Sequence, residues 1–362
     1  MQTFSQYSTL ALDCSTVVGI GNFDGLHHGH LALVNQVKSQ AQQRGLKSAI
    51  LTFSPHPMRF FKGDRGPHAL YSTQDRLSLL NTLGIEITLL QEFTLAFAQL
   101  SPYDFVLDVL IKALKAKVIV VGYDFAFGHK RSGRVKDLCD VAEQWGSEVL
   151  VVEAQNWENQ HVNPSYFQSS HSSYLPESQK QNIQEHLARS PVFSSTWIRT
   201  LLKEGQVELA ELALSRPYHV RGEVSHGHKR GRQIGFPTAN LALSSEICPQ
   251  PGVYAGWLDW GQGPQMSVIS VGTNPTFQTP HLLHHQQPWS VEVHVLEDQD
   301  SSLDLYGKQC CLWFTDFIRS PIQFDGIHDL IVQIKEDCQH ASAVLKQRIL
   351  PQWPISVSLE SI

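Results

Sequence analysis

The sequence predicts an α/β protein of two domains, an N-terminal doubly wound parallel sheet and a small C-terminal antiparallel β-barrel with a terminal helix. Up to residue 153, short apolar runs alternate with segments of helical periodicity, the βαβα order of a parallel sheet. From residue 218 onward, short apolar runs are separated by clusters of Gly, Pro and Asn, which is typical of a small barrel. A chain of 362 residues is long enough for two hydrophobic cores.

The first half of the chain contains five predicted strands and four predicted helices. The strands are short and apolar, whereas the helices place apolar residues on one face; Leu77, Leu80 and Leu83 recur every three residues before Gly84. The predicted strands are 16–20, 49–53, 86–90, 117–121 and 148–153, and the predicted helices are 30–43, 74–83, 102–114 and 135–145. Ligands of such sheets bind at the carboxyl ends of the strands.

The middle of the chain interrupts this order. Residues 155–190 are rich in Gln, Ser, Asn and His, which predicts a mobile insertion or a long loop with at most one short helix. The change of period near residues 215–217 places the boundary between domains of residues 1–215 and 216–362. Two short helices are predicted at 196–202 and 207–214, barrel strands at 252–257, 266–271, 290–296 and 309–317, and a last helix at 327–349.

The composition narrows the classes of function. A formal net charge of −6 argues against general nucleic-acid binding, because phosphate backbones are held chiefly by an excess of Lys and Arg. No apolar run approaches the roughly 18 residues of a membrane span, and the N-terminus does not resemble a signal peptide. The six sparse cysteines form no C-x-x-C pair, which predicts reduced, buried thiols. We therefore expect a cytoplasmic protein without a membrane or nucleic-acid partner.

The most distinctive local feature is the segment 21–30, GNFDGLHHGH, between a predicted strand and a predicted helix. Gly21 and Gly25 let the backbone approach a ligand closely, and the start of the helix offers N–H groups to an anion. His27 and His30, three residues apart, would face the same phosphate. Three other interpretations stay open: a simple turn, a metal site that would need further ligands, and a helix-capping histidine. His28 has no assigned role.

This segment resembles the G-x-F-D-G-x-H-x-G-H signature of the nucleotidylyltransferase superfamily, in the form used by bacterial bifunctional riboflavin kinase/FAD synthetases. Three further segments match the pattern of that family in the same order. They are TFSPHP at 52–57, VGYDFAFG at 121–128 followed by Arg131 and Gly133, and SSTWIR at 194–199. Each segment taken singly could be a turn or a helix cap. Four matches in one order favour the functional interpretation.

The resemblance implies a nucleotidylyltransferase-like sheet in which an FMN phosphate attacks the α-phosphorus of ATP and expels pyrophosphate. His27 and His30 would contact the ATP phosphates, and Arg199 would hold the triphosphate from a second helix start. The other positions implied in nucleotide or flavin binding are Gly21, Asn22, Phe23, Asp24, Gly25, His56, Asp124, Arg131, Ser195 and Thr196.

Two residues depart from the family pattern. Ala126 stands where many relatives have Arg, and Arg76 stands where many have Lys. The sequence leaves their effect on flavin contacts open.

The second domain begins with glycines spaced among basic residues between positions 219 and 241. Such a segment suits a flap that closes over phosphates, although by itself it could equally be a solvated loop. Thr238 and Asn240 lie two residues apart in an extended segment, so they face the same side. Both offer oxygen ligands of the kind that Mg²⁺ accepts beside ATP.

GFPTAN at 235–240 resembles the riboflavin kinase signature, and the match continues with PGVYA at 251–255, VGTNPTF at 271–277, VEVH at 291–294 and LYG at 305–307. The resemblance implies that Glu292 is the general base that takes the proton from the riboflavin 5′-hydroxyl. Arg319 and Phe324 fall in a segment similar to one that borders the flavin. The implied ATP site comprises Gly222, Gly227, Lys229, Arg232, Gly235, Pro237, Thr238 and Asn240, with Thr238 and Asn240 as Mg²⁺ ligands.

The sequence therefore predicts a Mg²⁺-dependent bifunctional enzyme that binds riboflavin, FMN and ATP. Riboflavin and ATP would give FMN, and FMN with a second ATP would give FAD and pyrophosphate. Two alternatives remain: a single-activity riboflavin kinase with a degenerate N-terminal domain, and a flavin- or nucleotide-binding regulator.

Overall fold

The computed structural model describes residues 1–156, 185, 192–225, 231, 234–243, 247–273, 289–296, 305–348 and 350. Nearly all of the predicted insertion at 155–190 lies outside the described residues. By internal contacts the chain forms two compact units, Met1–Gln160 with Val192–Ser194, and His161–Pro191 with Ser195–Ile362. The first unit contains a sheet and the second a barrel, each with its own core.

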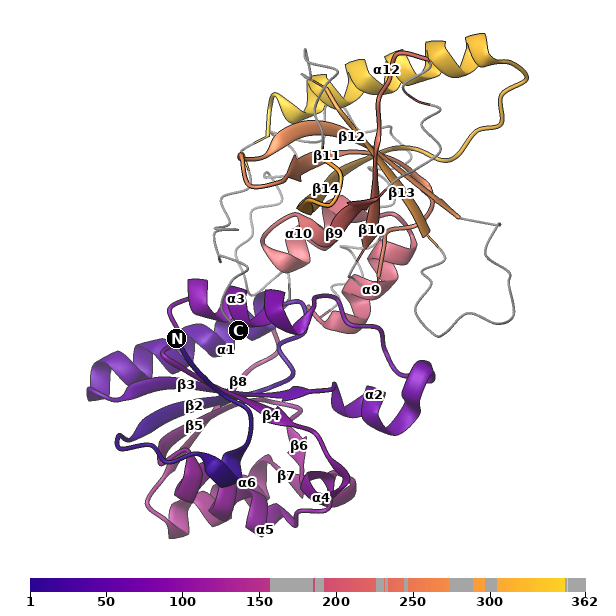
Figure 1. Cartoon of the computed structure of the whole chain (residues 1–362). Helices are drawn as coiled ribbons and strands as arrows, with labels where there is room; N and C mark the ends of the chain where they lie inside the picture. The colour runs from indigo at the N-terminus through magenta and orange to yellow at the C-terminus, as the bar shows by residue number, and fades with distance from the viewer. Residues whose placement is uncertain are drawn as a thin grey trace. The chain divides into compact units, whose positions relative to one another are not determined.

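The first unit is built on a six-stranded sheet of parallel neighbours in the order β1-β4-β3-β2-β5-β8 (Figure 1). The chain runs from β2 outward through β3 and β4 and then returns to β5 on the other side of β2. Doubly wound sheets bind their ligands at such a reversal of strand order, which here lies beside β2. The strand order confirms the predicted fold class. The strands are β1 (Gln2–Phe4), β2 (Thr16–Ile20), β3 (Lys47–Ser54), β4 (Ile87–Glu92), β5 (Ala116–Gly122) and β8 (Glu148–Val152).

Helices cover both faces of this sheet (Figure 1). Side chains alternate along β5, so Ile119 and Val121 join a core cluster with residues of η3, while Val118 and Val120 are buried on the opposite face, where α1 packs. The helical segments are α1 (His28–Arg44), α2 (Pro57–Lys62), α3 (Thr73–Thr82), α4 (Leu95–Ala98), α5 (Pro102–Asp104), α6 (Val135–Gln144), η1 (Tyr7–Thr9), η2 (Gly63–Arg65), η3 (Phe105–Ala113) and η4 (His129–Arg131).

Helix α1 packs closely against β2 because Gly19 has no side chain. A Cβ atom at this position would lie 2.6 Å from Leu33 Cδ2 and 2.8 Å from Val37 Cγ2, which is far inside van der Waals contact. The close packing of strand and helix determines where the loop between them, residues 21–27, is held.

Several elements of this unit were not predicted from the sequence. The three-residue β1 pairs with β4 at the sheet edge, but its exposed Gln2 and Thr3 provide no apolar alternation. The predicted helix at 102–114 is divided into a single turn, α5, and a π-helical segment, η3. Further unpredicted elements are α2, α4 and a two-stranded ribbon of β6 (Ala126–Phe127) and β7 (Gly133–Arg134).

The second unit is a closed six-stranded barrel of antiparallel neighbours in the order β10-β13-β12-β11-β14-β9, as predicted. Both faces of β11 are buried: Tyr254 and Leu258 lie on one face, and Val253, Ala255 and Trp257 on the other, where they pack with residues of α12. The elements are β9 (Tyr218–Ser225), β10 (Ala239–Leu243), β11 (Gly252–Asp259), β12 (Gln265–Thr273), β13 (Trp289–Val295), β14 (Gln309–Arg319), α9 (Ser195–Lys203), α10 (Val207–Leu214) and α12 (Ile327–Leu345).

The helices α9 and α10 belong to the barrel unit by their contacts, since α10 packs against α9, β9 and β14. Sequence periodicity alone could not assign them, because the change from helical to strand period comes after α10. The compact unit that contains the barrel therefore begins before residue 215. The division into domains at 215/216 stays a prediction.

The six cysteines are all free thiols. The prediction that they are buried is only partly right. Burial holds for Cys248, Cys310 and Cys311, whereas Cys14, Cys139 and Cys338 are partly exposed.

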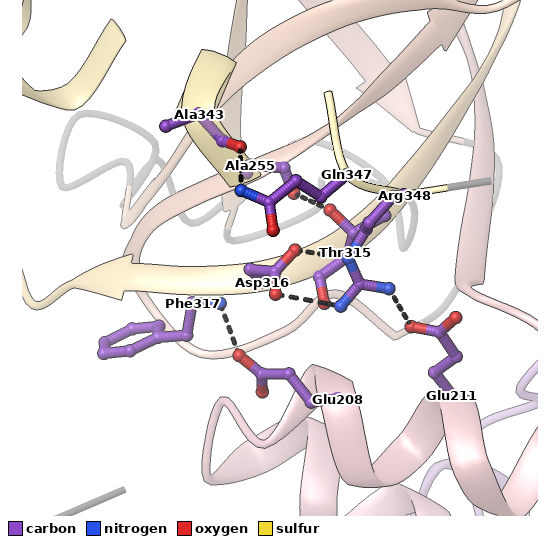
Figure 2. Close-up of polar contacts among 9 residues, drawn as sticks. All are labelled: Glu208, Glu211, Ala255, Thr315, Asp316, Phe317, Ala343, Gln347 and Arg348. Carbon is purple, nitrogen blue, oxygen red and sulfur yellow. Dashed lines mark hydrogen bonds and ion pairs between the residues drawn. The ribbon is translucent and has the colours of Figure 1, made fainter. Parts of the chain in front are cut away.

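A cluster of buried charged side chains joins α10, β14 and the segment after α12 (Figure 2). Arg348 donates from Nη1 to Glu211 Oε2 at 2.6 Å, and from Nη2 to Asp316 Oδ1 at 2.8 Å and the Thr315 carbonyl at 3.0 Å. Glu208, on the same helix as Glu211, accepts a hydrogen bond from the Phe317 N–H at 2.8 Å. Two carboxylates therefore contact one guanidinium in the interior of this unit, and the carboxyl group of Glu208 belongs to the same cluster.

The excess of carboxyl groups predicts a pH-dependent stability. Burial, together with the nearby charge of Asp316, raises the pKa of Glu208 from 4.5 to about 8. The folded protein keeps this proton up to that pH, whereas the unfolded chain releases it near pH 4.5, so the contribution of Glu208 to stability is lost as the pH rises towards 8. Glu208→Gln imitates the protonated form and should unfold at higher denaturant concentration than wild type at pH 8.5.

At pH 5 the two proteins should have nearly the same free energy of unfolding. At pH 8.5 the free energy of unfolding of Glu208→Gln should exceed that of wild type by on the order of a few kcal/mol. Urea unfolding followed by tryptophan fluorescence at both pH values measures it. A gap that does not change with pH would contradict the assignment of the proton to Glu208.

Candidate functional site

The loop between β2 and α1 has an unusual backbone. Phe23, Gly25 and Leu26 have φ of 50°, 86° and 44°, in the left-handed region that costs a non-glycine residue about 1–3 kcal/mol. Phe23 and Leu26 are nevertheless fully buried, with 0% and 1% exposure, and burial of their side chains offsets the strain. The loop is thus held in one conformation and delivers the chain into α1 at the carboxyl end of β2.

The two predicted phosphate-binding histidines lie together at this helix start. The rings of His27 and His30 stack with their centroids 3.8 Å apart, and Phe23 lies 5.2 Å from the ring of His30. His27 is the N-cap of α1 by backbone conformation, but its side chain does not cap the helix. Within the described residues, no group of three or more His, Cys, Asp or Glu could hold a metal ion. The ring of His28 packs instead against Phe193, with the two ring centroids 4.8 Å apart.

Asn22 and Asp24 tie the loop to its neighbours. The Asn22 carbonyl accepts hydrogen bonds from Thr52 Oγ1 at 3.0 Å and from Arg76 Nη1 at 2.8 Å. Asp24 is only 4% exposed, and its Oδ1 accepts from the N–H groups of Leu70 and Tyr71 at 2.9 and 3.4 Å. Both predicted site residues therefore hold the loop in place through these bonds.

His56 follows the end of β3 and caps the short helix α2, because its Nδ1 accepts the Met58 N–H at 3.1 Å. Beyond it lies an aromatic cluster that the sequence analysis missed. Phe60 and Phe61 contact each other and Phe93, and Phe61 is 63% exposed. The adjacent pair of phenylalanines after a strand end was the available signal. An exposed aromatic surface of this kind can stack on a flat ligand.

Asp124 and Arg131 are exposed and follow the carboxyl end of β5, which neighbours β2 in the sheet. Arg131 has a left-handed φ of 57°. Ala126 lies between Phe125 and Phe127, whose rings stack at 5.3 Å. Asp124 therefore follows β5, the strand that pairs with β2, and the histidine loop follows β2 at the same edge of the sheet.

Ser195, Thr196 and Arg199 lie on α9, in the second unit. Ile198, Leu201 and Leu202 are the buried side chains of this helix, and Thr196 is exposed at its start. Their predicted place beside His27 and His30 stays a prediction.

In the barrel, Thr238 and Glu292 come within hydrogen-bonding reach, with Thr238 Oγ1 donating to Glu292 Oε2 at 3.4 Å. Asn240 of β10 is paired with Glu292 of β13 in the strand register. Glu292 is exposed, between the buried Val291 and Val293. The three residues that the sequence proposed for kinase chemistry are therefore gathered where the start of β10 runs beside β13, although Thr238 and Glu292 are 54 positions apart in the chain.

His294 is a site residue that the sequence analysis assigned no role. It lies two residues after Glu292, and its Nδ1 is 2.8 Å from the Pro237 carbonyl. Its ring also packs edge-on against Phe236 at 5.5 Å. Since alternate residues of a strand share a face, the VEVH pattern could have indicated that His294 supports the segment that carries Thr238.

The predicted glycines have different local roles. Gly235 has a φ of +87°, a conformation that L side chains rarely adopt. At Gly222 a Cβ atom would lie 2.6 Å from the Ala242 carbonyl oxygen, so this glycine permits the close approach of β9 and β10. Gly227, Lys229 and Arg232 lie outside the described residues.

Arg319 makes a bidentate ion pair with Asp337 of α12, at 2.9 and 2.7 Å, and lies 6.0 Å from the Phe324 ring. These contacts attach the end of β14 to the terminal helix.

Two family models match the chain, one for FAD synthetase over residues 10–166 and one for riboflavin kinase over residues 214–345. Curated relatives from Listeria monocytogenes and Escherichia coli, both described as bifunctional riboflavin kinase/FMN adenylyltransferase, are 33% and 32% identical to it. The Listeria match covers 91% of this chain and 93% of the relative, and the Escherichia match covers 89% and 90%. The chain belongs to this bifunctional family.

The family that the sequence motifs predicted is therefore confirmed. The riboflavin kinase/FMN adenylyltransferase family models divide the site residues between them. The FAD synthetase model includes His27, His30, His56 and Asp124 but ends before Ser195, and the riboflavin kinase model includes all the predicted barrel residues.

A solved structure from Streptococcus pneumoniae, described as a macrolide-efflux protein, has a similar architecture. It is 27% identical, with a TM-score of 0.75, and the match covers 94% of this chain and 98% of that one. The efflux description belongs to that protein. In the part of the present chain that is described, no helix is long and apolar enough to cross a membrane.

Proposed function

We propose that this chain carries out two successive steps of flavin cofactor synthesis. The barrel unit phosphorylates riboflavin with ATP to give FMN and ADP. The parallel-sheet unit transfers AMP from a second ATP to FMN, giving FAD and pyrophosphate. The observation that carries the proposal is the convergence of Thr238, Asn240 and Glu292 where the start of β10 meets β13, in a chain that also contains the strained histidine loop at the switch point of its sheet.

In the kinase step, Glu292 accepts the proton of the riboflavin 5′-hydroxyl as that oxygen attacks the γ-phosphorus of ATP and ADP leaves. Its exposure gives the substrate access, and Thr238 orients the carboxylate through the 3.4 Å contact. The hydroxyl of Thr238 and the side-chain carbonyl of Asn240 are hard oxygen donors two residues apart in the chain, which fits Mg²⁺. When bound, Mg²⁺ would neutralise charge on the ATP phosphates.

In the adenylyl-transfer step, alignment and charge neutralisation do most of the chemistry. In this proposal the His27 and His30 rings, which stack at the start of α1, and the first N–H groups of that helix hold the phosphates of ATP. The exposed surface of Phe60 and Phe61 offers a platform for the flavin ring. That Ser195, Thr196 and Arg199 hold the triphosphate stays a prediction from the family motif.

The proposed partners are small molecules only: riboflavin, FMN and ATP. A cytoplasmic location also belongs to the proposal, because free thiols at all six cysteines fit a reducing compartment.

Incubation of the purified protein with riboflavin and Mg-ATP, followed by chromatography of the flavins, tests this function. We expect both FMN and FAD from the wild type. His30→Ala should lower FAD formation from supplied FMN by about 10²–10³-fold, because it removes a donor aimed at developing phosphate charge, and should leave FMN formation unchanged.

His28→Ala is the matched control, since His28 belongs to the same segment but packs against Phe193. A wild type that forms neither flavin would favour a binding protein over an enzyme. Undiminished FAD formation in His30→Ala would overturn the assigned role of that histidine.

A further inference from the structure

Arg76 connects two segments that converge on the first site. It lies in the first turns of α3 and is only 7% exposed. Its Nη1 donates to the Asn22 carbonyl at 2.8 Å, and its Nη2 donates to the Phe53 carbonyl at 2.9 Å. Asn22 belongs to the loop after β2, and Phe53 is the penultimate residue of β3. One guanidinium therefore links the carboxyl ends of two neighbouring parallel strands.

Burial of this cation must be compensated by its partners. Burial lowers the pKa of Arg76, and the nearby charge of Asp24 opposes this effect. Asp24 lies two residues after Asn22, so the charge and the hydrogen bonds of Arg76 both act on the same loop. The planar fork of Arg can reach two carbonyl groups at once in a fixed geometry, which a single ammonium group cannot reproduce.

The segments that Arg76 joins carry the side chains of the adenylyl-transfer site. Immediately after Asn22, the loop passes through the left-handed Phe23 and Leu26 and ends at His27. Shortly after Phe53, the chain reaches His56 and the exposed aromatic side chains of α2. A shift of the Asn22 carbonyl relative to Phe53 would therefore displace the histidine pair relative to the aromatic cluster.

We propose that Arg76 is a positioning residue for adenylyl transfer, which holds the histidine loop and the segment after β3 in a fixed mutual geometry through the Asn22 and Phe53 carbonyls. It acts without touching ATP or FMN. The inference rests on the proposed adenylyl-transfer function of this unit. It gives the Arg at position 76, where many relatives have Lys, a role in holding the loop.

The test compares Arg76→Met and Arg76→Lys with wild type in steady-state FAD formation from FMN and ATP. Arg76→Met should raise the KM for ATP and lower kcat/KM by about 100-fold, because a displacement of about 1 Å can cost that much. Arg76→Lys should keep the charge and one carbonyl contact, so we expect partial rescue. FMN formation from riboflavin by the same preparations should be unchanged, and it serves as an internal control.

A matched surface control is Arg44→Met, which removes the exposed ion pair with Glu148 at the other end of α1. If Arg76 only stabilises the fold, the variants will lose active enzyme, and kcat will fall with an unchanged KM for ATP. An unchanged KM in either folded variant overturns the proposal, and if Arg76→Met fails to fold, Arg76→Lys alone decides. Failure of the proposed function is seen separately, as a wild type that forms no FAD.

Discussion

Glu292→Gln should lower the rate of FMN formation by about 10²–10⁴-fold, the usual contribution of a positioned general base, while FAD formation from supplied FMN continues at the wild-type rate. The amide keeps the size of the carboxylate and can still accept the hydrogen bond from Thr238, 3.4 Å away. It cannot take a proton from the riboflavin hydroxyl. The measurement is the initial rate of each flavin product by chromatography, with riboflavin or FMN as the starting flavin.

Glu223→Gln is the matched control, because Glu223 is an exposed carboxylate on β9 of the same barrel and bonds to Gln309 at 3.1 Å. It should leave both activities unchanged. If Glu292→Gln retained wild-type FMN formation, Glu292 would not be the general base, and the barrel chemistry would need another proton acceptor.

Arg348→Met should have the largest effect on stability, a loss of about 3–5 kcal/mol in the free energy of unfolding, because it leaves buried carboxylates without their cation. The guanidinium holds Glu211 at 2.6 Å and Asp316 at 2.7–2.8 Å, and its side chain is only 5% exposed. Urea unfolding followed by tryptophan fluorescence measures the change, since Trp257 and Trp313 are buried in the barrel unit.

Lys346→Met controls for loss of a positive charge in the same segment, because Lys346 is exposed two residues earlier. We expect its unfolding midpoint to match wild type. A wild-type midpoint in Arg348→Met as well would mean that the cluster in Figure 2 contributes little to holding the C-terminal segment against α10.

The sequence allowed the fold to be predicted where a pattern repeats over a short stretch. The alternation around Glu292 and the apolar run of β5 both arise within a single element, and both gave the correct strand. In contrast, β1 has three residues with an exposed start, too few to show a period. The π-helical turn of η3 follows a helical apolar pattern that does not distinguish it from an α-helix.

For the candidate site, the motifs indicated which residues to consider, and the structure showed which contacts those residues make. The segments 21–30 and 235–240 were recognisable because a loop that is to bind phosphate needs a restricted backbone and therefore restricted residue types; their phosphate contacts stay a prediction. Asp24 and Asn22, however, belong to the predicted ligand pocket by motif, whereas their contacts in the fold run to Leu70, Tyr71, Thr52 and Arg76. No local pattern could reveal this, because the partners are 30 to 54 positions away.

The sequence by itself thus determined the two domain classes and the family, and it proposed residues for phosphate chemistry, since each depends on local periodicity or on a short motif. Only the tertiary structure decided that α10 packs on the barrel, that Arg76 links two strand ends, and that Glu208 shares a buried cluster with Arg348. These features depend on burial and on charges brought together across long separations in the chain. Their contribution to stability depends on how far the new contacts offset the loss of hydration of groups that meet only in the folded state.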